Sequence, residues 1–447
     1  MSLIDKIAAA GVVGAGGAGF PTHVKYNTKA EYLIINGAEC EPLLRSDKFL
    51  MSNFPEEIIE GIKMVADSIG VEHTVFAIKK HYENEYGCLK KVIDEKGYEI
   101  EFFLMDSFYP AGDEHTMVLD ITGRIVPEMG IPLEVGCVVT NVGTIYNSYR
   151  ADKNLAVVDK YVSVLAEVNE PRIVKVPIGT PVRECIKAAG GSTLADFAVI
   201  VGGPMMGNNL VEKADIDKAV ITKTDGSIII LPQDQFVIER NQQSMEHIKN
   251  KAKAACIQCT LCTEYCPRYL NGHGLEPHRI MRALAYEEVN SAEVFKSAQL
   301  CCLCGICELY ACPMALSPRL VNEYYIEQAD QKYKSSKTEY QVHPMREYRK
   351  IPTDRQIARL DLNKYNHQKL YKLVELEVNE VIIPLVQHIG VPAELAVSEG
   401  QKVERGDLIG RARENALSVN IHASISGTVK KADNTKVIIS KSAEVVL

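Results

Sequence analysis

Two runs of cysteines constrain this chain more than any other feature of its sequence. Each run follows a C-x2-C-x2-C pattern and ends in a further cysteine followed by proline, with one extra residue before that last cysteine in the second run. Three thiolates at steps of three wrap a short loop around one [4Fe–4S] cubane, and the fourth cysteine usually ligates the other cluster. This rule assigns one cluster to Cys256, Cys259, Cys262 and Cys312, and the second cluster to Cys301, Cys304, Cys307 and Cys266.

The alternative interpretation of these cysteines is a pair of structural zinc sites. Zinc sites favour paired C-x2-C units over triplets, so the cluster interpretation is preferred. Two clusters placed together form an electron relay, and the rest of the chain is expected to hold an electron donor and an electron acceptor. Residues 278–300, between the runs, carry helical patterning and predict a helical insert. His273 and His278 stand at neither helical nor strand spacing and are interpreted as solvated loop residues.

The overall composition excludes several classes of protein. At 447 residues, the chain is long enough for about three or four domains. Its net charge of −8, without a basic run, argues against nucleic acid as a partner. No long apolar run predicts a membrane span, and the first residues do not form a secretory signal. Because eight of the thirteen cysteines lie in cluster spacing, we expect a reducing, cytoplasmic location rather than a disulfide framework.

The first 150 residues alternate helical and extended patterns. Helices are predicted over 4–10, 55–69 and 83–95, and strands over 32–35, 74–78, 99–105 and 137–140. This alternation predicts an α/β layer fold. A glycine-rich loop over 14–22 formally matches G-x-G-x-x-G, but it follows a helical segment and Pro21 interrupts the next one, which disfavours a dinucleotide fingerprint. Its exposed backbone N–H groups still suit a phosphate.

Three polar segments follow strands of this domain, where open α/β sheets gather ligands. They cover residues 36–42, 109–114 and 140–144, and any one of them alone is more often a plain polar turn. Together with the glycine loop, in this order and spacing, they resemble the flavin- and NADH-binding subunit of respiratory complex I and the C subunit of Rnf complexes. The sequence departs from complex I at Ala38, which replaces an aspartate, and at Gly143, which replaces a glutamate.

This resemblance implies the roles of individual residues. An FMN site is implied for Gly14, Gly16, Gly17, Gly19, Phe20, Thr22, Lys25, Asn36, Glu39, Asn141 and Thr144. Catalytic positions, on the nicotinamide side of the flavin, are implied for Glu39, Tyr109, Asp113 and Glu114. For Asp113 and Glu114 the alternative is that they cap the helix that begins there, as acidic residues commonly do. Cys302 breaks the step of three and is interpreted as a bystander.

The remaining segments complete a multidomain α/β architecture. We predict an FMN- and NADH-binding domain over 1–155, a β-grasp (SLBB) domain over 156–240, a two-cluster ferredoxin-type domain over 241–330, a polar linker over 331–370, and a barrel-sandwich hybrid over 371–447. Strands at 161–167, 172–177 and 197–201, with a helix starting near Pro181, indicate the β-grasp domain. The last domain resembles lipoyl domains, but Ala416 stands about where the carrier lysine would be, so a structural or docking role is expected.

The domain order, with the barrel-sandwich last, resembles the cobalamin reductases of propanediol-utilisation microcompartments. The resemblance implies an oxidoreductase that takes electrons from NADH through FMN and two [4Fe–4S] clusters to a corrinoid, in support of a B12-dependent diol dehydratase. It also implies a place inside a microcompartment, with a shell protein or another oxidoreductase as partner. Two alternatives remain open: an electron-transfer subunit fed by a separate flavoprotein, and a subunit of an Rnf-type or proline-reductase-type system with another acceptor.

Overall fold

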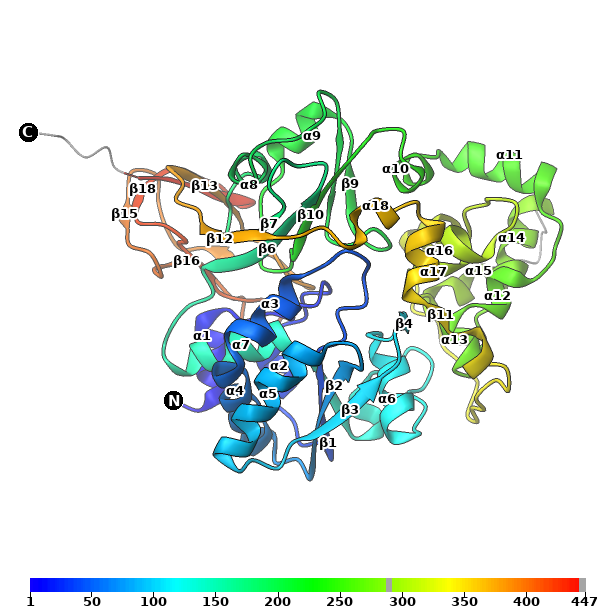
Figure 1. Cartoon of the computed structure of the whole chain (residues 1–447), viewed down its shortest axis with the longest axis horizontal. Helices are drawn as coiled ribbons and strands as arrows, with labels where there is room; N and C mark the ends of the chain where they lie inside the picture. Colours follow the sequence, from blue (N-terminus) through cyan, green and yellow to red (C-terminus); the bar gives the residue numbers. More distant parts are fainter. Residues whose placement is uncertain (287–291, 442–447) are drawn as a thin grey trace, which may run out of the picture.

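The computed structural model describes residues 1–286 and 292–441, which form four packed units. In Figure 1 the α/β domain lies at the bottom in blue and cyan, with the β-grasp domain above it in green. The cluster domain lies to one side, in light green and yellow, and the barrel-sandwich lies to the other side, in orange and red. Among the described helices, none is long and apolar enough to cross a bilayer.

The α/β domain is built on a parallel sheet with the strand order β3-β2-β1-β5. These strands are β1 (Tyr32–Asn36), β2 (His73–Lys79), β3 (Glu101–Met105) and β5 (Cys137–Asn141). Its helices are α1 (Leu3–Ala10), α2 (Thr22–Tyr26), α3 (Ser46–Asn53), α4 (Pro55–Ile69), α5 (Glu83–Lys96), α6 (Glu114–Thr122) and α7 (Val142–Asp152). Every helix and strand predicted here from the sequence is present, so the periodicity is confirmed.

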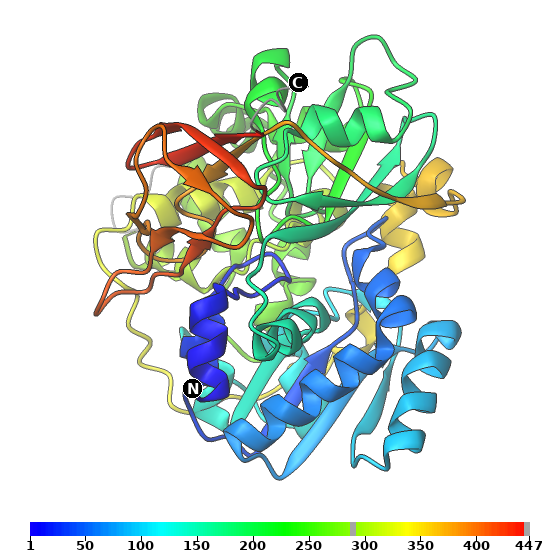
Figure 2. The ribbon, with the colours of Figure 1, turned by 90° about the vertical axis from the view of Figure 1, so that its left-hand side faces the viewer.

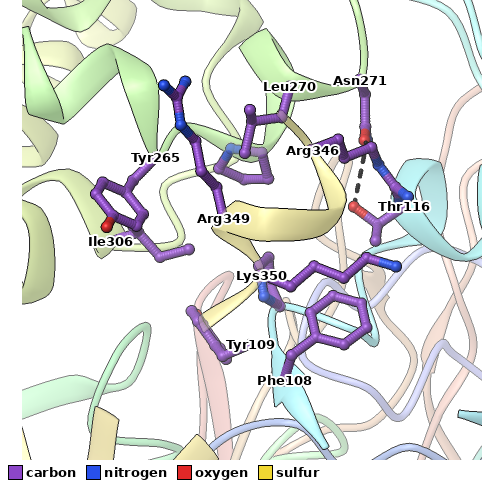
Figure 3. Close-up of a pocket in the computed structure, with 12 residues that line it drawn as sticks. Phe108, Tyr109, Thr116, Tyr265, Leu270, Asn271, Ile306, Arg346, Arg349 and Lys350 are labelled. Atoms are coloured by element: carbon purple, nitrogen blue, oxygen red, sulfur yellow. Dashed lines mark hydrogen bonds between the residues drawn. The ribbon is translucent and has the colours of Figure 1, made fainter. Parts of the chain in front are cut away.

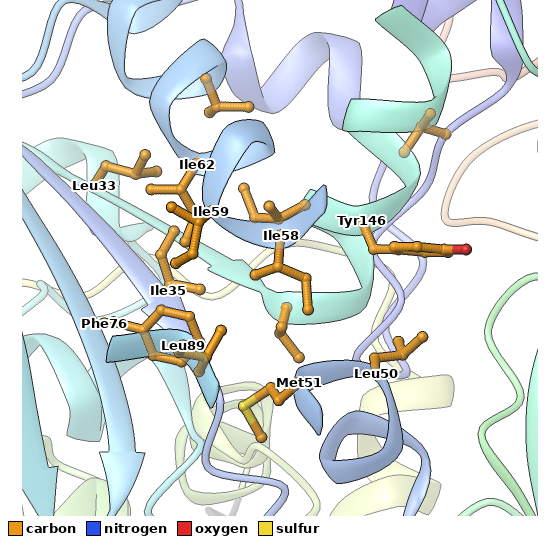
Figure 4. Close-up of a cluster of buried hydrophobic side chains, with 14 of the residues drawn as sticks. Leu33, Ile35, Leu50, Met51, Ile58, Ile59, Ile62, Phe76, Leu89 and Tyr146 are labelled. Carbon is orange, nitrogen blue, oxygen red and sulfur yellow. The ribbon is translucent and has the colours of Figure 1, made fainter. Parts of the chain in front are cut away.

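Helix α4 supplies much of the core of this domain. Pro55 opens the helix, where its missing N–H has no helical partner, and Gly70 ends it at φ 71°. Ile58 and Ile62 repeat at helical spacing and are fully buried. Figure 4 shows them with Ile59 against Ile35 of β1 and neighbouring apolar side chains. This packing holds the sheet at a fixed distance from the helices on one face.

The β-grasp domain carries a six-stranded mixed sheet ordered β12-β7-β6-β10-β8-β9. These strands are β6 (Asp159–Ala166), β7 (Arg172–Pro177), β8 (Ala198–Val201), β9 (Asn208–Leu210), β10 (Ser227–Leu231) and β12 (Tyr371–Glu375), with helices α8 (Val182–Ala188) and α9 (Lys213–Lys218). The predicted strands and the helix after Pro181 are confirmed. Strand β12 follows the cluster domain in sequence and pairs in parallel with β7, so the chain returns to this sheet.

The cluster domain is helical, as expected. Its main helices are α10 (Phe236–Asn241), α11 (Met245–Ala255), α12 (Leu261–Glu264), α13 (Pro267–Leu270), α14 (Pro277–Tyr286), α15 (Ala292–Lys296) and α16 (Pro318–Glu327). Between the cysteine runs, α14, α15 and a short 3-10 turn over Ser297–Leu300 confirm the helical patterning. The part of that prediction over 287–291 lies outside the described residues.

The segment expected to be a polar linker is partly folded against the other domains. It contains α17 (Thr353–Arg359), α18 (Asn363–Asn366) and β11 (Ile351–Pro352), and β11 pairs with β4 (Phe108–Tyr109) of the α/β domain. Arg346 is buried rather than solvated, and its Nη1 lies 2.7 Å from Asp120 Oδ1. The polar composition of this segment therefore serves contacts between domains.

The barrel-sandwich consists of two small antiparallel sheets around one apolar core. Its strands are β13 (Glu380–Pro384), β14 (Glu394–Leu395), β15 (Lys402–Val403), β16 (Leu408–Arg411), β17 (Ile421–His422), β18 (Gly427–Ala432) and β19 (Lys436–Ser440). In Figure 2 this unit lies beside the loop that leaves α1, in dark blue. Asn420 and Ala8, which are 412 positions apart in the sequence, are thus neighbours.

Candidate flavin and iron–sulfur site

A cavity of about 280 Å³ opens at the carboxyl ends of β1 and β5. The two strands pair in register, so their last residues, Asn36 and Asn141, lie side by side at its floor. This is the edge at which open α/β sheets bind ligands. The cavity gathers most of the predicted site residues, namely Gly14, Gly16, Gly19, Phe20, Thr22, Lys25, Asn36, Tyr109, Asp113, Glu114, Asn141 and Thr144.

The glycine loop forms one wall of the cavity and is closed on itself. Gly14 N donates to Phe20 O at 2.9 Å, and Ala15 N donates to Thr144 Oγ1 at 2.9 Å. Gly19 has φ +67°, a conformation that a side chain would strain. Gly17 also has a positive φ, but it does not line the cavity, and a Cβ there would meet nothing within 4 Å. Gly17 therefore shapes the turn without facing the ligand space.

The residues around this loop suit the phosphate end of FMN. Thr22 is 1% exposed, lines the cavity, and its Oγ1 has no hydrogen-bond partner among the described residues. A buried hydroxyl without a partner is unfavourable, so a ligand acceptor such as a phosphate oxygen would satisfy it. Lys25 lies beside it, and its Nζ is 2.6 Å from Glu114 Oε1 and 2.7 Å from Val139 O. The donor chemistry of the loop thus fits FMN.

The structure does not bring Glu39 to the cavity. Its carboxylate accepts from Asp47 N at 2.9 Å and from Ser46 Oγ at 3.3 Å, which satisfies the first turn of α3. The backbone of Glu39 has φ +36°, which turns this side chain away from its neighbours in the same motif. Glu39 thus fills a helix-capping position, and the cavity-facing carboxylate comes from two residues further along.

Glu41 is the residue that the site assignment from sequence missed. Its Oε2 accepts from Met205 N of the β-grasp domain at 3.0 Å, whereas its Oε1 is buried without a partner in the described chain. Burial raises the pKa of Glu41 to about 7. The only signal in the sequence was that Glu41 shares a motif with Glu39, and nothing local decides which carboxylate faces the ligand.

The raised pKa of Glu41 predicts a pH-dependent stability. An unfolded glutamate titrates near pH 4.3, so the folded protein binds the additional proton between that pH and about 7. The contribution of Glu41 to stability is therefore full below the unfolded pKa and is lost as pH rises through the folded pKa. We expect Glu41→Gln to raise the free energy of unfolding at pH 8 by a few kcal/mol, on the order of 2, and much less at pH 5.

Denaturant unfolding of flavin-free protein at both pH values measures this difference. Gln retains an acceptor for Met205 N, so the variant isolates the charge from the hydrogen bond. An equal shift at pH 5 and pH 8 would show that Glu41 is not held protonated by burial.

Asp113 and Glu114 follow Tyr109 at the start of α6, and both line the cavity. Asp113 Oδ1 accepts from Thr116 N at 3.1 Å, so this residue does cap the helix. It also receives two bonds from Arg268 of the cluster domain, at 2.7 and 2.9 Å. Burial alone would raise the pKa of Asp113, but the Arg268 guanidinium outweighs it and lowers that pKa. Capping and lining the cavity are therefore compatible.

The structure brings the cysteines of the two runs together in two groups. Cys256, Cys259, Cys262 and Cys312 line one pocket. Burial, and then the neighbouring thiols of this group, raise the pKa of Cys262 to about 12. The pKa of Cys307 is likewise raised by burial and then by Cys301, and Cys266 also contributes. The last cysteine of each run therefore lies beside the other run, in the crossed arrangement that the spacing predicts.

The donor geometry suits clusters rather than single ions. Among the described residues, no three histidine, cysteine or acidic side chains converge closely enough to hold one metal ion. Four thiols around one pocket instead leave room for a multinuclear cluster. His273 is buried, not solvated as predicted, and its Nε2 lies 2.9 Å from Val126 O. His278 Nδ1 lies 2.7 Å from Thr263 Oγ1, so both histidines have structural partners.

The second cysteine run forms part of the flavin cavity wall. Cys302 and Cys304 line the cavity, and Tyr109 Oη donates to Cys304 O at 2.9 Å. Cys302 is therefore placed between the cavity and the second group of cysteines, a position that its broken spacing did not reveal. Because the two candidate cofactor sites share this wall, electrons would cross there over a short path.

A smaller pocket lies on the far side of Tyr109, where three units meet (Figure 3). Asn271 Nδ2 donates to Thr116 Oγ1 at 3.2 Å, and Arg346 Nε donates to Asn271 Oδ1 at 2.8 Å. Its volume of about 20 Å³ is enough for a single water. Arg346 Nη2 has no partner in the described chain, and a water there would satisfy it. This pocket is part of the joint between domains.

Four family models match consecutive parts of the chain. They are the Nuo51 FMN-binding domain over residues 7–150, the SLBB domain over 161–209, the 4Fe-4S dicluster domain over 255–317 and the RnfC barrel sandwich hybrid domain over 361–447. The predicted fold class, FMN and the iron–sulfur clusters are thereby confirmed. The match to the barrel-sandwich model includes the segment around α18 and β12.

Curated relatives cover nearly the whole chain. Cobalamin reductase PduS of Salmonella typhimurium is 36% identical over 95% of this chain and 93% of its own length. The Citrobacter freundii protein of the same name is 34% identical over 97% and 95%. The RnfC-like component of the Na⁺-translocating ferredoxin:NAD⁺ oxidoreductase complex of Acetobacterium woodii is 32% identical, over 58% of this chain and 56% of that protein. This chain is therefore an oxidoreductase that belongs to the PduS cobalamin reductase family.

Proposed function

We propose that this protein oxidises NADH and passes the electrons, through FMN and two [4Fe–4S] clusters, to a corrinoid. The observation that carries this proposal is the shared wall between the flavin cavity and the second cysteine run, at Cys302 and Cys304. When bound, FMN accepts an electron pair as hydride and releases it as single electrons, which the clusters can carry. The corrinoid acceptor is inferred from the name of the two PduS relatives.

The side chains of the chain divide the cavity into two ends. Thr22 and the loop N–H groups form the phosphate end, as described above. Glu114 and Asp113 lie where a nicotinamide would stack on the flavin, and their carboxylates are suited to accept hydrogen bonds from ribose hydroxyls or a carboxamide. Tyr109, which is 2% exposed, excludes water between the cavity and the second group of cysteines. Glu39 is not assigned a role in the chemistry.

The test of the function is anaerobic NADH oxidation by the purified protein with cob(III)alamin, a disulfide or ferricyanide as acceptor. Yellow protein that reduces cob(III)alamin with NADH supports the proposal. Protein that binds no flavin, or that needs a separate flavoprotein, is instead an electron-transfer subunit. Reduction of ferricyanide but not of the corrinoid would assign another acceptor. A microcompartment location, with a shell or oxidoreductase partner, stays a prediction.

Glu114→Gln is expected to slow only the NADH-driven half of the reaction. The loss of a charged hydrogen-bond acceptor for the nicotinamide should lower kcat/KM for NADH about tenfold, or ~1.4 kcal/mol. Reduction of the acceptor by dithionite-treated variant should proceed at the unmodified rate, because that route bypasses the nicotinamide. Equal slowing on both routes would contradict an NADH site at Glu114.

The salt bridge of Glu114 requires a control. Its Oε1 lies 2.6 Å from Lys25 Nζ, so the variant also frees a lysine next to the phosphate loop. FMN affinity should therefore be measured on the same preparation. An unchanged FMN affinity assigns the loss of rate to NADH.

A further inference from the structure

The barrel-sandwich contacts the flavin loop at both of its ends. At the first end, Asn420 Nδ2 lies 3.3 Å from Ala8 O and 3.4 Å from Ala9 O, in the last turn of α1. At the other end, Ile389 N donates to Gly19 O at 3.1 Å. Figure 2 shows the loop after α1 passing beside this domain. The closed loop from Gly14 to Phe20 therefore lies between two points that the C-terminal domain holds.

Lys223 of the β-grasp domain joins the three units at the first point. It is 2% exposed, and its Nζ donates to Gly11 O at 2.7 Å and to Asn420 O at 2.9 Å. Within the described part of the chain, no carboxylate forms an ion pair with this buried ammonium, which is held by carbonyl groups from two other domains. Burial lowers the pKa of Lys223 to about 7, as expected without an anionic partner.

The approach of the backbones at these points leaves no space for adjustment. A Cβ on Gly11 would lie 2.2 Å from Asn420 O and 2.7 Å from Lys223 Nζ. A Cβ on Gly19 would lie 2.9 Å from Thr224 Cγ2 and 3.2 Å from His388 Cα. Both glycines have positive φ, so loop shape and domain contact are set by the same two residues. A shift of the barrel-sandwich would therefore shift the loop.

We propose that the barrel-sandwich and Lys223 position the flavin loop, so that the C-terminal domain sets the affinity for the phosphate of FMN. Lys223 and Asn420 act as positioning residues that do not touch the flavin. The inference rests on the proposed FMN site, and it gives the domain without a carrier lysine a function within the same chain.

The test compares FMN with riboflavin, which lacks the phosphate, on full-length flavin-free protein. Lys223→Met removes two hydrogen bonds from a charged donor, so FMN affinity should fall about tenfold or more. Riboflavin affinity should change by less than about twofold, which is within the normal spread of a surface substitution. Asn420→Ala should lower the preference for FMN in the same direction. The ³¹P shift of bound FMN should also move in both variants.

Two controls make the result decisive. Lys430→Met removes an exposed lysine of the barrel-sandwich that pairs with Glu380 of β13, and it should leave both affinities unchanged. Arg405→Ala breaks the ion pair between the barrel-sandwich and Asp159 of the β-grasp domain, and it should also leave both affinities unchanged, because Arg405 does not hold the loop.

Several outcomes would overturn the inference. One is an equal loss of FMN and riboflavin binding in Lys223→Met, and another is unchanged binding in both Lys223→Met and Asn420→Ala. Failure of the unmodified protein to bind FMN would instead overturn the proposed function.

Discussion

Anaerobically reconstituted protein is expected to hold about eight irons per chain, and Cys307→Ser about four. Cys307 is buried within the second group of cysteines, so no other thiol of its run can replace it at the same position. A serine hydroxyl is a poor ligand for iron in these clusters, which are held by thiolates. Iron and sulfide analysis of the purified variant, with its visible absorbance, measures the loss.

Cys302→Ser is the matched control for this prediction. Cys302 is adjacent to a proposed ligand, but it stands outside the step of three and lines the flavin cavity. We expect it to retain about eight irons, while Cys259→Ser loses the other cluster. If Cys302→Ser lost iron and Cys307→Ser did not, the ligand assignment of the second run would be wrong. Stoichiometric zinc in place of iron would refute both clusters.

Arg268→Met is expected to lower the free energy of unfolding by about 3–5 kcal/mol, because it leaves a buried carboxylate without its partner. Arg268 is 8% exposed and binds both oxygens of Asp113, at 2.7 and 2.9 Å. The pair connects the first turn of α6 to α13, which begins directly after Cys266. The variant should therefore also weaken the contact between the flavin cavity and the second cluster. Denaturant unfolding and the rate of cluster reduction by NADH measure the two effects.

The double variant Arg268→Met/Asp113→Asn separates lost charge from lost packing. Asparagine retains an acceptor for Thr116 N, so α6 keeps its cap. Because no isolated charge is left buried, the double variant should recover a large part of the stability lost in Arg268→Met. A double variant as unstable as the single one would show that the guanidinium acts through packing alone.

The sequence alone determined those features that depend on neighbours in the chain. Steps of three between cysteines specify a loop that wraps a cubane, so the eight ligands could be proposed before any fold was known. Periodicity of two and of 3.6 located the strands and helices of the α/β and β-grasp domains. Polar segments after parallel strands meet at one sheet edge, and Asn36 and Asn141 do so in register.

The tertiary structure decided which side chains face the ligand and which domains hold them. Glu39 and Glu41 are equivalent in composition, and only a positive φ at Glu39 and the approach of Met205 direct the second carboxylate to the cavity. Arg268 meets Asp113 across 155 residues, and Lys223 meets Gly11 across 212. Such contacts depend on how the surfaces of separate domains fit together. No local pattern encodes that fit, because the same short segment folds in the same way whichever partner it later packs against.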